Sequence, residues 1–369
     1  MDAFIYDITK IEPHPNADRL VVAHVMGYRC ITATGMVNVG DKVVYIAPDA
    51  MIDVESPWLD QKIAQYLGKH GRVRNVRLRG LISEGLIFKA DIFTDEQLAA
   101  IAEGRAADVG ITHYSPPVKE PRNTALGNVA ENVRRTELPF GLSKTDQENV
   151  QQIPRNLVVN KTYLVTKKMD GTSCTIAIKS SKKQLDDENF HLINKDGERW
   201  SFDIHIASRN LDLKIDHPDN VYVVTALPIA TRLCEYIANT LQPESVVVAR
   251  GEICGTGINK SAPNADADGD PVFHLFEFFF LSENGIRRLN IFEVFPLIAS
   301  TVGKVCREFQ KVTLTEENYD EVINEYLDAP AEKYGEGVVF WEVDTTSPAN
   351  TLMTGFSFKA KSRDYYAQL

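Results

Sequence analysis

The feature that most constrains the fold of this chain is a change in its hydrophobic pattern about a third of the way along its 369 residues. Before this point, short apolar runs alternate with turn residues, whereas beyond it the runs are longer and two helical patterns occur. A proline-containing stretch from Tyr114 to about Arg155 separates the two patterns. At roughly 150 residues per domain, we place two domains at residues 1–115 and 116–369, with the connecting segment 116–155 inside the second.

The first domain is predicted to be built mainly of short β-strands. Turn residues, notably Pro13–Asp18, separate five runs of strand character, which are Phe4–Ile8, Leu20–Met26, Tyr28–Thr32, Lys42–Ile46 and Leu86–Lys89. Five strands at this spacing are typical of a small barrel of the OB type. One short helix is expected over 94–103, because Thr94 and Gln97 can form a capping box and Gly104 can end the helix.

The second domain is predicted to be an α+β unit. One helix is expected from about Pro228 to Leu241, since the apolar residues of this stretch recur on one helical face. A second is expected from about Glu316 to Leu327, with Thr315 as its N-cap. The fold class predicted for the whole chain is therefore α+β, with a barrel before the larger domain.

Composition excludes several other classes of protein. The net charge of −11 argues against a protein that coats nucleic acid non-specifically. The five cysteines lie far apart without a CxxC pair, which predicts free thiols in a reducing compartment rather than a zinc site. The N-terminus does not resemble a signal peptide, and the most apolar run, Phe273 to Leu281, is far shorter than the ~20 residues that span a bilayer. We expect a cytoplasmic protein, or a nuclear one in a eukaryote, with no membrane partner.

One lysine stands where a predicted strand ends. Two apolar runs of β type flank a glycine-containing turn in residues 164–178, and Lys168 closes the first run. A lysine in this place can present its amine to a pocket while the sheet holds its backbone. The pattern Lys168-Met-Asp170-Gly171 is short, however, and taken alone it favours a solvated hairpin tip.

Further motifs along the chain indicate that this pattern has a function. Lys168-Met-Asp-Gly resembles motif I of the covalent nucleotidyltransferase superfamily, which comprises DNA ligases, RNA ligases and mRNA capping enzymes. The later motifs of that superfamily are matched in order by Ser208-Arg209-Asn210, Arg250–Gly255, Phe273–Glu277, Glu336–Val339 and Phe358–Lys361. Six motifs in the order of the family make coincidence negligible. The resemblance implies a ligase-type domain with antiparallel sheets and flanking helices.

The resemblance also implies roles for the basic residues. Lys168 would attack the α-phosphate of ATP and become linked to AMP. Because a free lysine is mostly protonated at neutral pH, we expect its pKa to be lowered by nearby positive charge. Lys359 and Lys361, as well as a divalent metal ion, are candidates for that charge. The two lysines are also expected to bind the ATP phosphates, since alternate residues of a strand share a face. Arg209 would contact a phosphate.

The remaining implied roles concern the base, the ribose and the metal ion. Glu252 would accept hydrogen bonds from the ribose hydroxyls, and Phe273 would stack on the adenine. Asp170 and Glu336 would bind Mg²⁺ or Mn²⁺. Three alternatives stay open: Glu336 as a solvated turn residue, Lys361 as a surface lysine, and Phe273 as a core residue with Phe276 stacking on the base.

The position of the barrel favours one branch of the superfamily. Only eight residues follow Lys361, so we expect no C-terminal OB domain of the kind that DNA ligases and capping enzymes carry. The chain instead resembles ATP-dependent RNA ligases that have an N-terminal OB module and seal nicks whose 3′-OH side is RNA. Residues 11–20, 39–46, 77–80 and 142–146 carry this part of the resemblance.

One basic segment lies in the first domain. Residues 68–80 contain Lys69 and four arginines, Arg72, Arg74, Arg77 and Arg79, and no acidic residue. A β-bulge near Asn75 would bring the four arginines to one face, where they could contact the backbone of a duplex beside a nick. The alternative is a solvated strand edge that deters strand pairing.

The sequence thus predicts an ATP-dependent RNA ligase that seals 3′-OH/5′-phosphate nicks through a lysyl-AMP intermediate and an adenylylated 5′ end. Its expected cofactors are ATP and Mg²⁺ or Mn²⁺, its expected substrate is nicked duplex RNA or an RNA–DNA hybrid, and it is expected to act as a monomer. The alternatives are a GTP-dependent capping enzyme, a DNA ligase, and a non-catalytic RNA-binding protein on a ligase fold.

Overall fold

The structure, a computed structural model, divides the chain into two compact units. The first comprises Met1–Val118, Gln151–Pro154 and Arg363–Leu369, and the second comprises Lys119–Val150 and Arg155–Ser362. The residues described are 2–48, 50–114, 133–182, 190–195, 197–217, 219–240, 246–258, 266, 268–283, 285–293, 301 and 303–368. Part of the predicted connecting segment, residues 115–132, lies outside this range. The last seven residues belong to the first unit, whereas the sequence placed them with the second domain.

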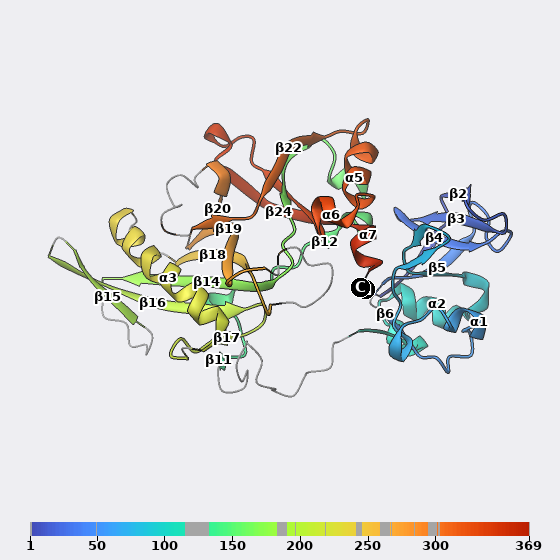
Figure 1. Cartoon of the computed structure of the whole chain (residues 1–369), viewed down its shortest axis with the longest axis horizontal. Helices are drawn as coiled ribbons and strands as arrows, with labels where there is room; N and C mark the ends of the chain where they lie inside the picture. The colour runs from blue at the N-terminus through green and yellow to red at the C-terminus, as the bar shows by residue number, and fades with distance from the viewer. Residues whose placement is uncertain are drawn as a thin grey trace. The chain divides into compact units, whose positions relative to one another are not determined.

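The described residues of the first unit form ten short strands and three short α-helices (Figure 1). Its strands are β1 (Ala3–Asp7), β2 (Lys10–Pro13), β3 (Leu20–Val25), β4 (Tyr28–Ala33), β5 (Lys42–Ile46), β6 (Ala50–Ile52), β7 (Val76–Leu78), β8 (Leu81–Ser83), β9 (Leu86–Lys89) and β10 (Ile111–His113). Its helices are α1 (Gln61–Ala64), α2 (Asp95–Ala102) and α7 (Arg363–Tyr366). The sheets are β1-β5-β9, β2-β3-β4, β6-β10 and β7-β8.

Strand β5 is the central strand of this unit. It pairs antiparallel with β1 on one side and β9 on the other, and its residues Val43 to Ile46 are fully buried. Because alternate residues face opposite sides, Val44 and Ile46 belong to one apolar cluster and Val43 and Tyr45 to another. The capping box predicted for Thr94 and Gln97 is present at the start of α2.

The C-terminal segment joins the first unit through a buried ion pair. Arg363 donates from Nε to Glu84 Oε2 at 2.6 Å, and both side chains are about 95% buried. Arg363 also donates to the Gly27 carbonyl, while Glu84 accepts from Gln151. These bonds explain why Arg363 and Gln151, which are distant in sequence, both belong to this unit.

The described residues of the second unit form one large sheet and three helices. Its strands are β11 (Val133–Arg135), β12 (Glu148–Asn149), β13 (Lys161–Lys167), β14 (Thr172–Ser181), β15 (Phe190–Lys195), β16 (Glu198–Ser208), β17 (Asp212–Leu213), β18 (Val246–Cys254), β19 (Val272–Ser282), β20 (Gly285–Leu289), β21 (Lys304–Val305), β22 (Glu308–Leu314), β23 (Gly337–Val343) and β24 (Leu352–Lys361). Its helices are α3 (Val221–Thr240), α5 (Tyr319–Leu327) and α6 (Ala331–Tyr334). The main strand order is β11-β17-β16-β14-β18-β19-β20-β24-β23-β13-β22.

Helix α3 covers one face of this sheet, across β14 and β16 (Figure 1). It begins seven residues before the predicted start, so that Pro228 lies inside the helix. The sequence pattern suggested Pro228 as the first helical residue, a position that proline favours. Packing decides otherwise, because Val223 and Ala226 in the earlier turns are buried and Asn220 accepts the N–H of Tyr222.

Length and composition alone would allow α3 to cross a membrane, since Val221–Asn239 has a mean hydropathy of 1.3. This stretch is longer than the apolar run Phe273 to Leu281. In the structure Ala230, Leu233 and Ile237 of α3 are buried in an apolar cluster of the second unit, and 44% of the stretch is buried. The buried face of α3 is therefore part of the core of this unit.

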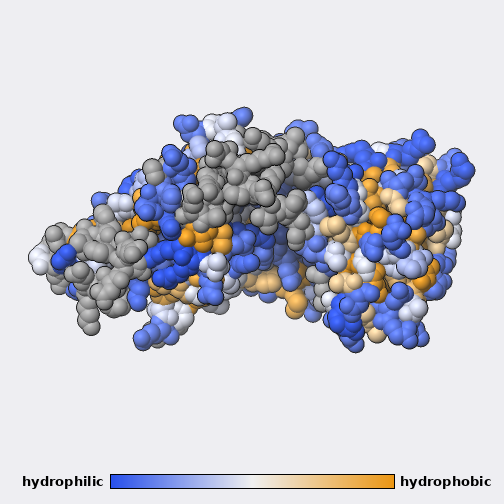
Figure 2. All heavy atoms as spheres, turned by 90° about the horizontal axis from the view of Figure 1, so that it is seen from below, coloured by the Kyte–Doolittle hydropathy of each residue, from blue (hydrophilic) through white to orange (hydrophobic). Residues whose placement is uncertain are grey.

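Helix α5 starts after the predicted cap. Thr315 and Asn318 exchange side-chain to backbone hydrogen bonds of 2.7 and 3.3 Å, and the helix begins at Tyr319. The five cysteines are buried and free, as predicted. Figure 2 shows one face of the molecule. Among the residues coloured by hydropathy, hydrophilic side chains surround separate apolar patches.

Candidate functional site

The predicted nucleophile, Lys168, follows the last residue of β13. Its backbone N–H donates to the Gly337 carbonyl at 2.9 Å, and its Nζ lies 2.6 Å from Glu336 Oε2. This contact arises because β13 and β23 are antiparallel neighbours, with Lys167 opposite Val338. The lysine that ends one strand and the glutamate that precedes the next are thus brought together across more than 160 residues of sequence.

Negative charge dominates the surroundings of Lys168. Burial favours the neutral amine, but the ion pair with Glu336 and the charges of Glu252 and Asp170 outweigh it, so the pKa of Lys168 lies above its ordinary value. The lowered pKa expected from the sequence depends on nearby lysines or a metal ion. Without bound nucleotide or metal the pKa of Lys168 is raised instead, because the effect of the carboxylates exceeds that of the cations of β24.

The lowered lysine pKa belongs to Lys359 instead. This residue lies opposite Val339 on β24, and Lys361 lies opposite Gly337. Burial, together with the charges of Lys361 and Lys168, lowers the pKa of Lys359 to about 8. Because Lys359 and Lys361 alternate on one strand, both amines lie on the face that also carries Val339.

Glu252 lies on β18, opposite Ser173 of β14 and His274 of β19. Burial and the nearby carboxylate of Glu336 raise its pKa to about 8, although the charge of Lys168 acts in the opposite direction. Glu252 therefore shares the electrostatic environment of Lys168 and lies on a separate wall of the site.

The turn after Lys168 is held tightly. Asp170 is 6% exposed, and its backbone N–H donates to Asp266 at 3.4 Å. A Cβ added at Gly171 would lie 2.2 Å from the Ile253 carbonyl oxygen, so only glycine fits at this point. The neighbouring Lys167 forms an ion pair with Asp266.

We next ask whether the site suits a divalent metal ion. Among the described residues, no group of three or more His, Cys, Asp or Glu side chains is arranged to hold one. Asp170 and Glu336 nevertheless both face the charge of Lys168, and two hard carboxylates suit Mg²⁺ or Mn²⁺, which keep several waters and bind phosphate oxygens. The donor set fits an ion that arrives with a nucleotide.

Arg209 lies in the turn between β16 and β17, where it forms an ion pair with Asp146. Both side chains are about half exposed. Burial would raise the pKa of Asp146, but the Arg209 guanidinium and the charge of Lys359 hold it below its ordinary value. Asp146 thus links Arg209 to the lysines of β24. Asp146 lies in residues 142–146, which resemble the RNA ligases with an N-terminal OB module, but the sequence alone indicates no role for it.

The aromatic strand β19 places its two phenylalanines differently. Phe273 is 2% exposed within the core cluster, and its ring fills the space beside Gly251, where an added Cβ would lie 2.4 Å from it. Phe276 is stacked against Trp341 of β23, with ring centroids 5.9 Å apart and planes 21° apart. Trp341 in turn donates from Nε1 to Thr166 at 2.9 Å. The buried position of Phe273 favours the alternative, with Phe276 as the stacking ring.

The four arginines of the basic segment 68–80 do not lie on one bulged strand, so this prediction is wrong. β7 covers only Val76–Leu78, and Arg79 lies in the turn to β8 with a positive φ of 50°. Arg77 pairs with Asp364, and the Arg72 guanidinium lies 4.1 Å from the centre of the Tyr114 ring. Arg74 and Arg79 are exposed.

Comparisons with known proteins give the following matches. A family model described as RNA ligase matches residues 161–361, and one described as an OB-fold domain matches residues 3–90. Among solved structures, the chain is similar to Naegleria gruberi RNA ligase. A variant with ATP and Mn has 24% identity and a TM-score of 0.71, covering 100% of this chain and 99% of that chain.

Two further structures of the Naegleria gruberi protein agree. A variant with AMP and Mn has 23% identity and a TM-score of 0.69, covering 100% of this chain and 98% of that chain. The ligase with PPi has 24% identity and a TM-score of 0.71, covering 98% and 97%. A search of curated proteins returned no match. These similarities confirm the predicted fold class, an OB-fold domain followed by a ligase domain with antiparallel sheets.

Proposed function

Because this chain belongs to the RNA ligase family, we propose that it is an ATP-dependent ligase that joins a 3′-OH end to a 5′-phosphate end through a lysyl-AMP intermediate. The observation that carries the proposal is the position of Lys168, whose Nζ lies 2.6 Å from Glu336 at the junction of β13 and β23. It is the amine placed among the carboxylates suited to a metal and beside the lysines suited to phosphates.

In the first step, the Nζ–phosphorus bond of Lys168 forms while the bond from the α-phosphorus to the bridging oxygen breaks. Pyrophosphate leaves, and the Nζ proton is released to water. Lys168 must first become neutral, which its ion pair with Glu336 opposes. Asp170 and Glu336 would hold a Mg²⁺ or Mn²⁺ ion, which would supply positive charge at the phosphates. With its charge offset in this way, Glu336 would no longer raise the pKa of Lys168.

The other residues bind and orient the nucleotide. Lys359 and Lys361 lie on the strand face beside Val339, where their amines can meet the negative charge that develops at phosphorus. Glu252 accepts hydrogen bonds from the ribose hydroxyls, and Phe276 stacks on the base in place of Phe273. Arg209 exchanges Asp146 for a phosphate.

The remaining two steps reuse the same site. A 5′-phosphate oxygen attacks the phosphorus of lysyl-AMP, which frees the Lys168 amine and leaves AMP on the 5′ end. The 3′-OH then attacks the 5′-phosphorus, a phosphodiester bond forms, and AMP leaves. We propose nicked duplex RNA or an RNA–DNA hybrid as the substrate, a monomer as the working form, and Arg74 and Arg79 as the arginines available to its backbone.

The test is transfer of label from α-labelled ATP to the protein in the presence of Mg²⁺ or Mn²⁺. Lys168→Ala should abolish labelling. Lys167→Ala is the matched control, because the neighbouring lysine pairs with Asp266 and should leave the label in place. Label on the Lys168→Ala protein would contradict the assignment, and label from GTP in place of ATP would point to a capping-type enzyme.

The labelled protein also tests the substrate. Nicked duplexes that differ only in ribose or deoxyribose on the 3′-OH side should be sealed unequally, with the ribose substrate preferred. Equal sealing of both would indicate a DNA ligase. Binding without labelling or sealing would indicate an RNA-binding protein that has lost catalysis.

A further inference from the structure

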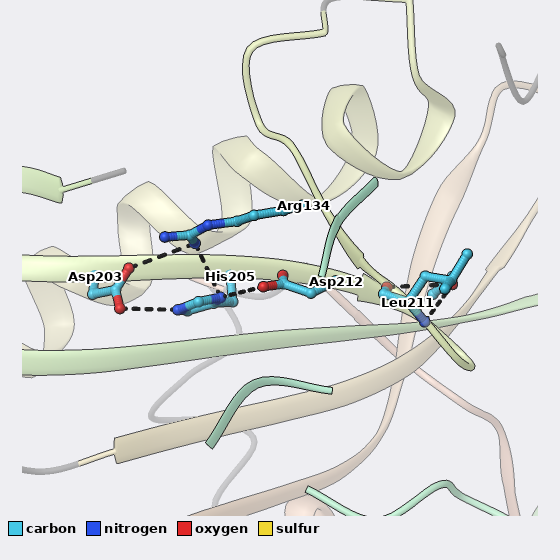
Figure 3. Close-up of polar contacts among 6 residues, drawn as sticks. Arg134, Asp203, His205, Leu211 and Asp212 are labelled. Atoms are coloured by element: carbon cyan, nitrogen blue, oxygen red, sulfur yellow. Dashed lines mark hydrogen bonds and ion pairs between the residues drawn. The ribbon is translucent and has the colours of Figure 1, made fainter. Parts of the chain in front are cut away.

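Four charged residues that the proposed mechanism does not use form a buried network in the second unit. They are Arg134, Asp203, His205 and Asp212, called the quartet below. His205 Nε2 lies 2.9 Å from Asp203, and its Nδ1 lies 2.8 Å from Asp212. Figure 3 shows the imidazole ring between the two carboxylates. The side chains of His205 and Asp212 are 1% and 0% exposed.

Charged groups surround the imidazole. Each ring nitrogen faces a carboxylate oxygen, to which a protonated nitrogen donates, and Arg134 Nη1 also lies 3.1 Å from Nδ1. Burial alone would favour the neutral ring, but the two hydrogen bonds and the charges of Asp203 and Asp212 raise the pKa of His205 above its ordinary value. Arg134 lies 3.8 Å from Asp203, so two cations balance two anions. Charged pairs of this kind are directional and are costly to separate once buried.

The quartet sits at the base of the turn that carries Arg209. His205 and Asp203 belong to β16, and Asp212 is the first residue after the turn, on β17. The turn itself is closed by a 2.9 Å bond from the Ser208 N–H to the Leu211 carbonyl and by a 3.2 Å bond from the Leu211 N–H to Ser208 Oγ. These two bonds tie Ser208 to Leu211 and so hold together the two ends of the turn that carries Arg209.

The strand after the turn is very short. β17 contains two residues and makes two register pairs with β16. On its other side, β17 pairs with β11, the strand that supplies Arg134. The His205 ring therefore joins the two strands of the turn directly, through Asp212, and Arg134 of β11 contacts Asp203 and His205 of β16 (Figure 3). These contacts add to the two register pairs between β16 and β17.

We propose that His205 and Asp212 are positioning residues for Arg209, which they hold where its guanidinium meets the phosphates of ATP. This inference rests on the proposed function, in which Arg209 contacts a phosphate. The guanidinium now pairs with Asp146, whose carboxylate also lies in the field of Lys359. The turn thus places Arg209 next to Asp146, a residue that also interacts with Lys359 of β24.

The experiment compares two isosteric variants that remove the same kind of hydrogen bond from the same ring. Asp212→Asn weakens the direct link from β16 to β17 across the turn. Asp203→Asn weakens a contact within β16 and the longer, 3.8 Å contact to Arg134 of β11, so it is the control that leaves the direct link across the turn in place. The readout is the KM for ATP and the maximal rate of lysine labelling in the full-length protein. Weaker ground-state binding of the phosphates by Arg209 raises KM more than it lowers the rate.

We expect Asp212→Asn to raise the KM for ATP by about tenfold and Asp203→Asn by less than about threefold, since weakening one charged hydrogen bond changes an equilibrium by roughly this factor. In an Arg209→Ala background, Asp212→Asn should cause no further increase. Equal effects of the two variants, or effects of Asp212→Asn and Arg209→Ala that multiply, would overturn the proposal.

Two further measurements keep the outcome decisive. His205→Gln retains a donor and an acceptor and should show the same dependence on Arg209 if Asp212→Asn does not fold, as checked by thermal unfolding. A wild-type protein that takes no label from ATP would refute the proposed function itself. Labelling of the wild type without coupling between the quartet and Arg209 would refute only the positioning role.

Discussion

At the scale of single residues, the site is governed by the balance between burial and charge. Three carboxyl groups, Asp170, Glu252 and Glu336, act on the pKa of Lys168 and raise it in sum. The same surroundings raise the pKa of Glu252 to about 8, while burial and neighbouring cations lower that of Lys359 to about 8. Without nucleotide, the carboxyl groups and amines of the site therefore shift one another's pKa values. Binding of a phosphate and a metal ion would change these pKa values again.

This balance predicts a pH-dependent stability for the protein without nucleotide. A carboxyl whose folded pKa is raised stabilises the fold below its unfolded pKa of 4.5, and that contribution is lost as pH rises through about 8. Glu252→Gln should therefore gain stability over wild type as pH increases, by on the order of 2 kcal/mol between pH 6 and pH 9. Chemical denaturation at both pH values measures the difference.

The control for this experiment is Glu332→Gln, which removes an exposed carboxylate of α6. Its stability relative to wild type should not change between the two pH values. A stability difference for Glu252→Gln that is the same at pH 6 and pH 9 would show that Glu252 ionises normally in the folded protein.

At the scale of elements, strand alternation decides which aromatic side chain is available to a base. On β19, Phe273 points into the core beside Gly251, while Phe276 contacts Trp341. The sequence offered both rings in one short apolar run and favoured Phe273. The distinction depends on the register with β18, which is interrupted by a bulge between Arg250 and Gly251.

The two phenylalanines should consequently respond in opposite ways to truncation. Phe276→Ala should raise the KM for ATP with little loss of stability, because it removes a stacking surface. Phe273→Ala should lower the free energy of unfolding by about 3–5 kcal/mol, because it leaves a cavity in a closed core. Nucleotide-dependent labelling and chemical denaturation of both variants separate the two roles. If Phe276→Ala lowered the free energy of unfolding and left the KM for ATP unchanged, Phe276 would be a core residue and Phe273 the candidate stacking ring.

At the scale of the whole molecule, the order of the chain does not follow the division into units. Residues Gln151–Pro154 and Arg363–Leu369 belong to the first unit although the segments before them belong to the second. The last of these crossings comes two residues after Lys361. The buried pair of Arg363 and Glu84 is therefore a determinant of the first unit that a search for contiguous domains overlooks.

This pair predicts a stability effect far from the proposed site. Arg363→Ala leaves Glu84 buried without its cation and should cost about 3 kcal/mol, as is usual when one partner of a buried ion pair is removed. Thermal unfolding of the full chain measures the loss. The double variant Arg363→Met with Glu84→Gln should recover part of it, because no uncompensated charge remains. An Arg363→Ala protein as stable as wild type would show that the pair contributes nothing.

The sequence by itself determined the fold class and the order of the motifs, because each depends on local patterns or on a short motif. The same motifs supply the residues of the proposed site, which are Lys168, Glu252, Glu336, Lys359 and Lys361. The strand β5, Lys42–Ile46, could also be found from local patterns, because its apolar run and flanking turn residues mark both of its ends.

Only the tertiary structure decided the charge states, the facing of β19 and the role of distant partners. The pKa of Lys168 depends on carboxylates up to 168 residues away in the chain, the ring that a base can reach depends on a bulge, and the start of α3 depends on core packing that overrides a proline. His205 gave no signal in the sequence, because a lone histidine in a strand acquires its charge only when folding places Asp203 and Asp212 against it. Local patterns set which residues are present, and long-range contacts set what those residues can do.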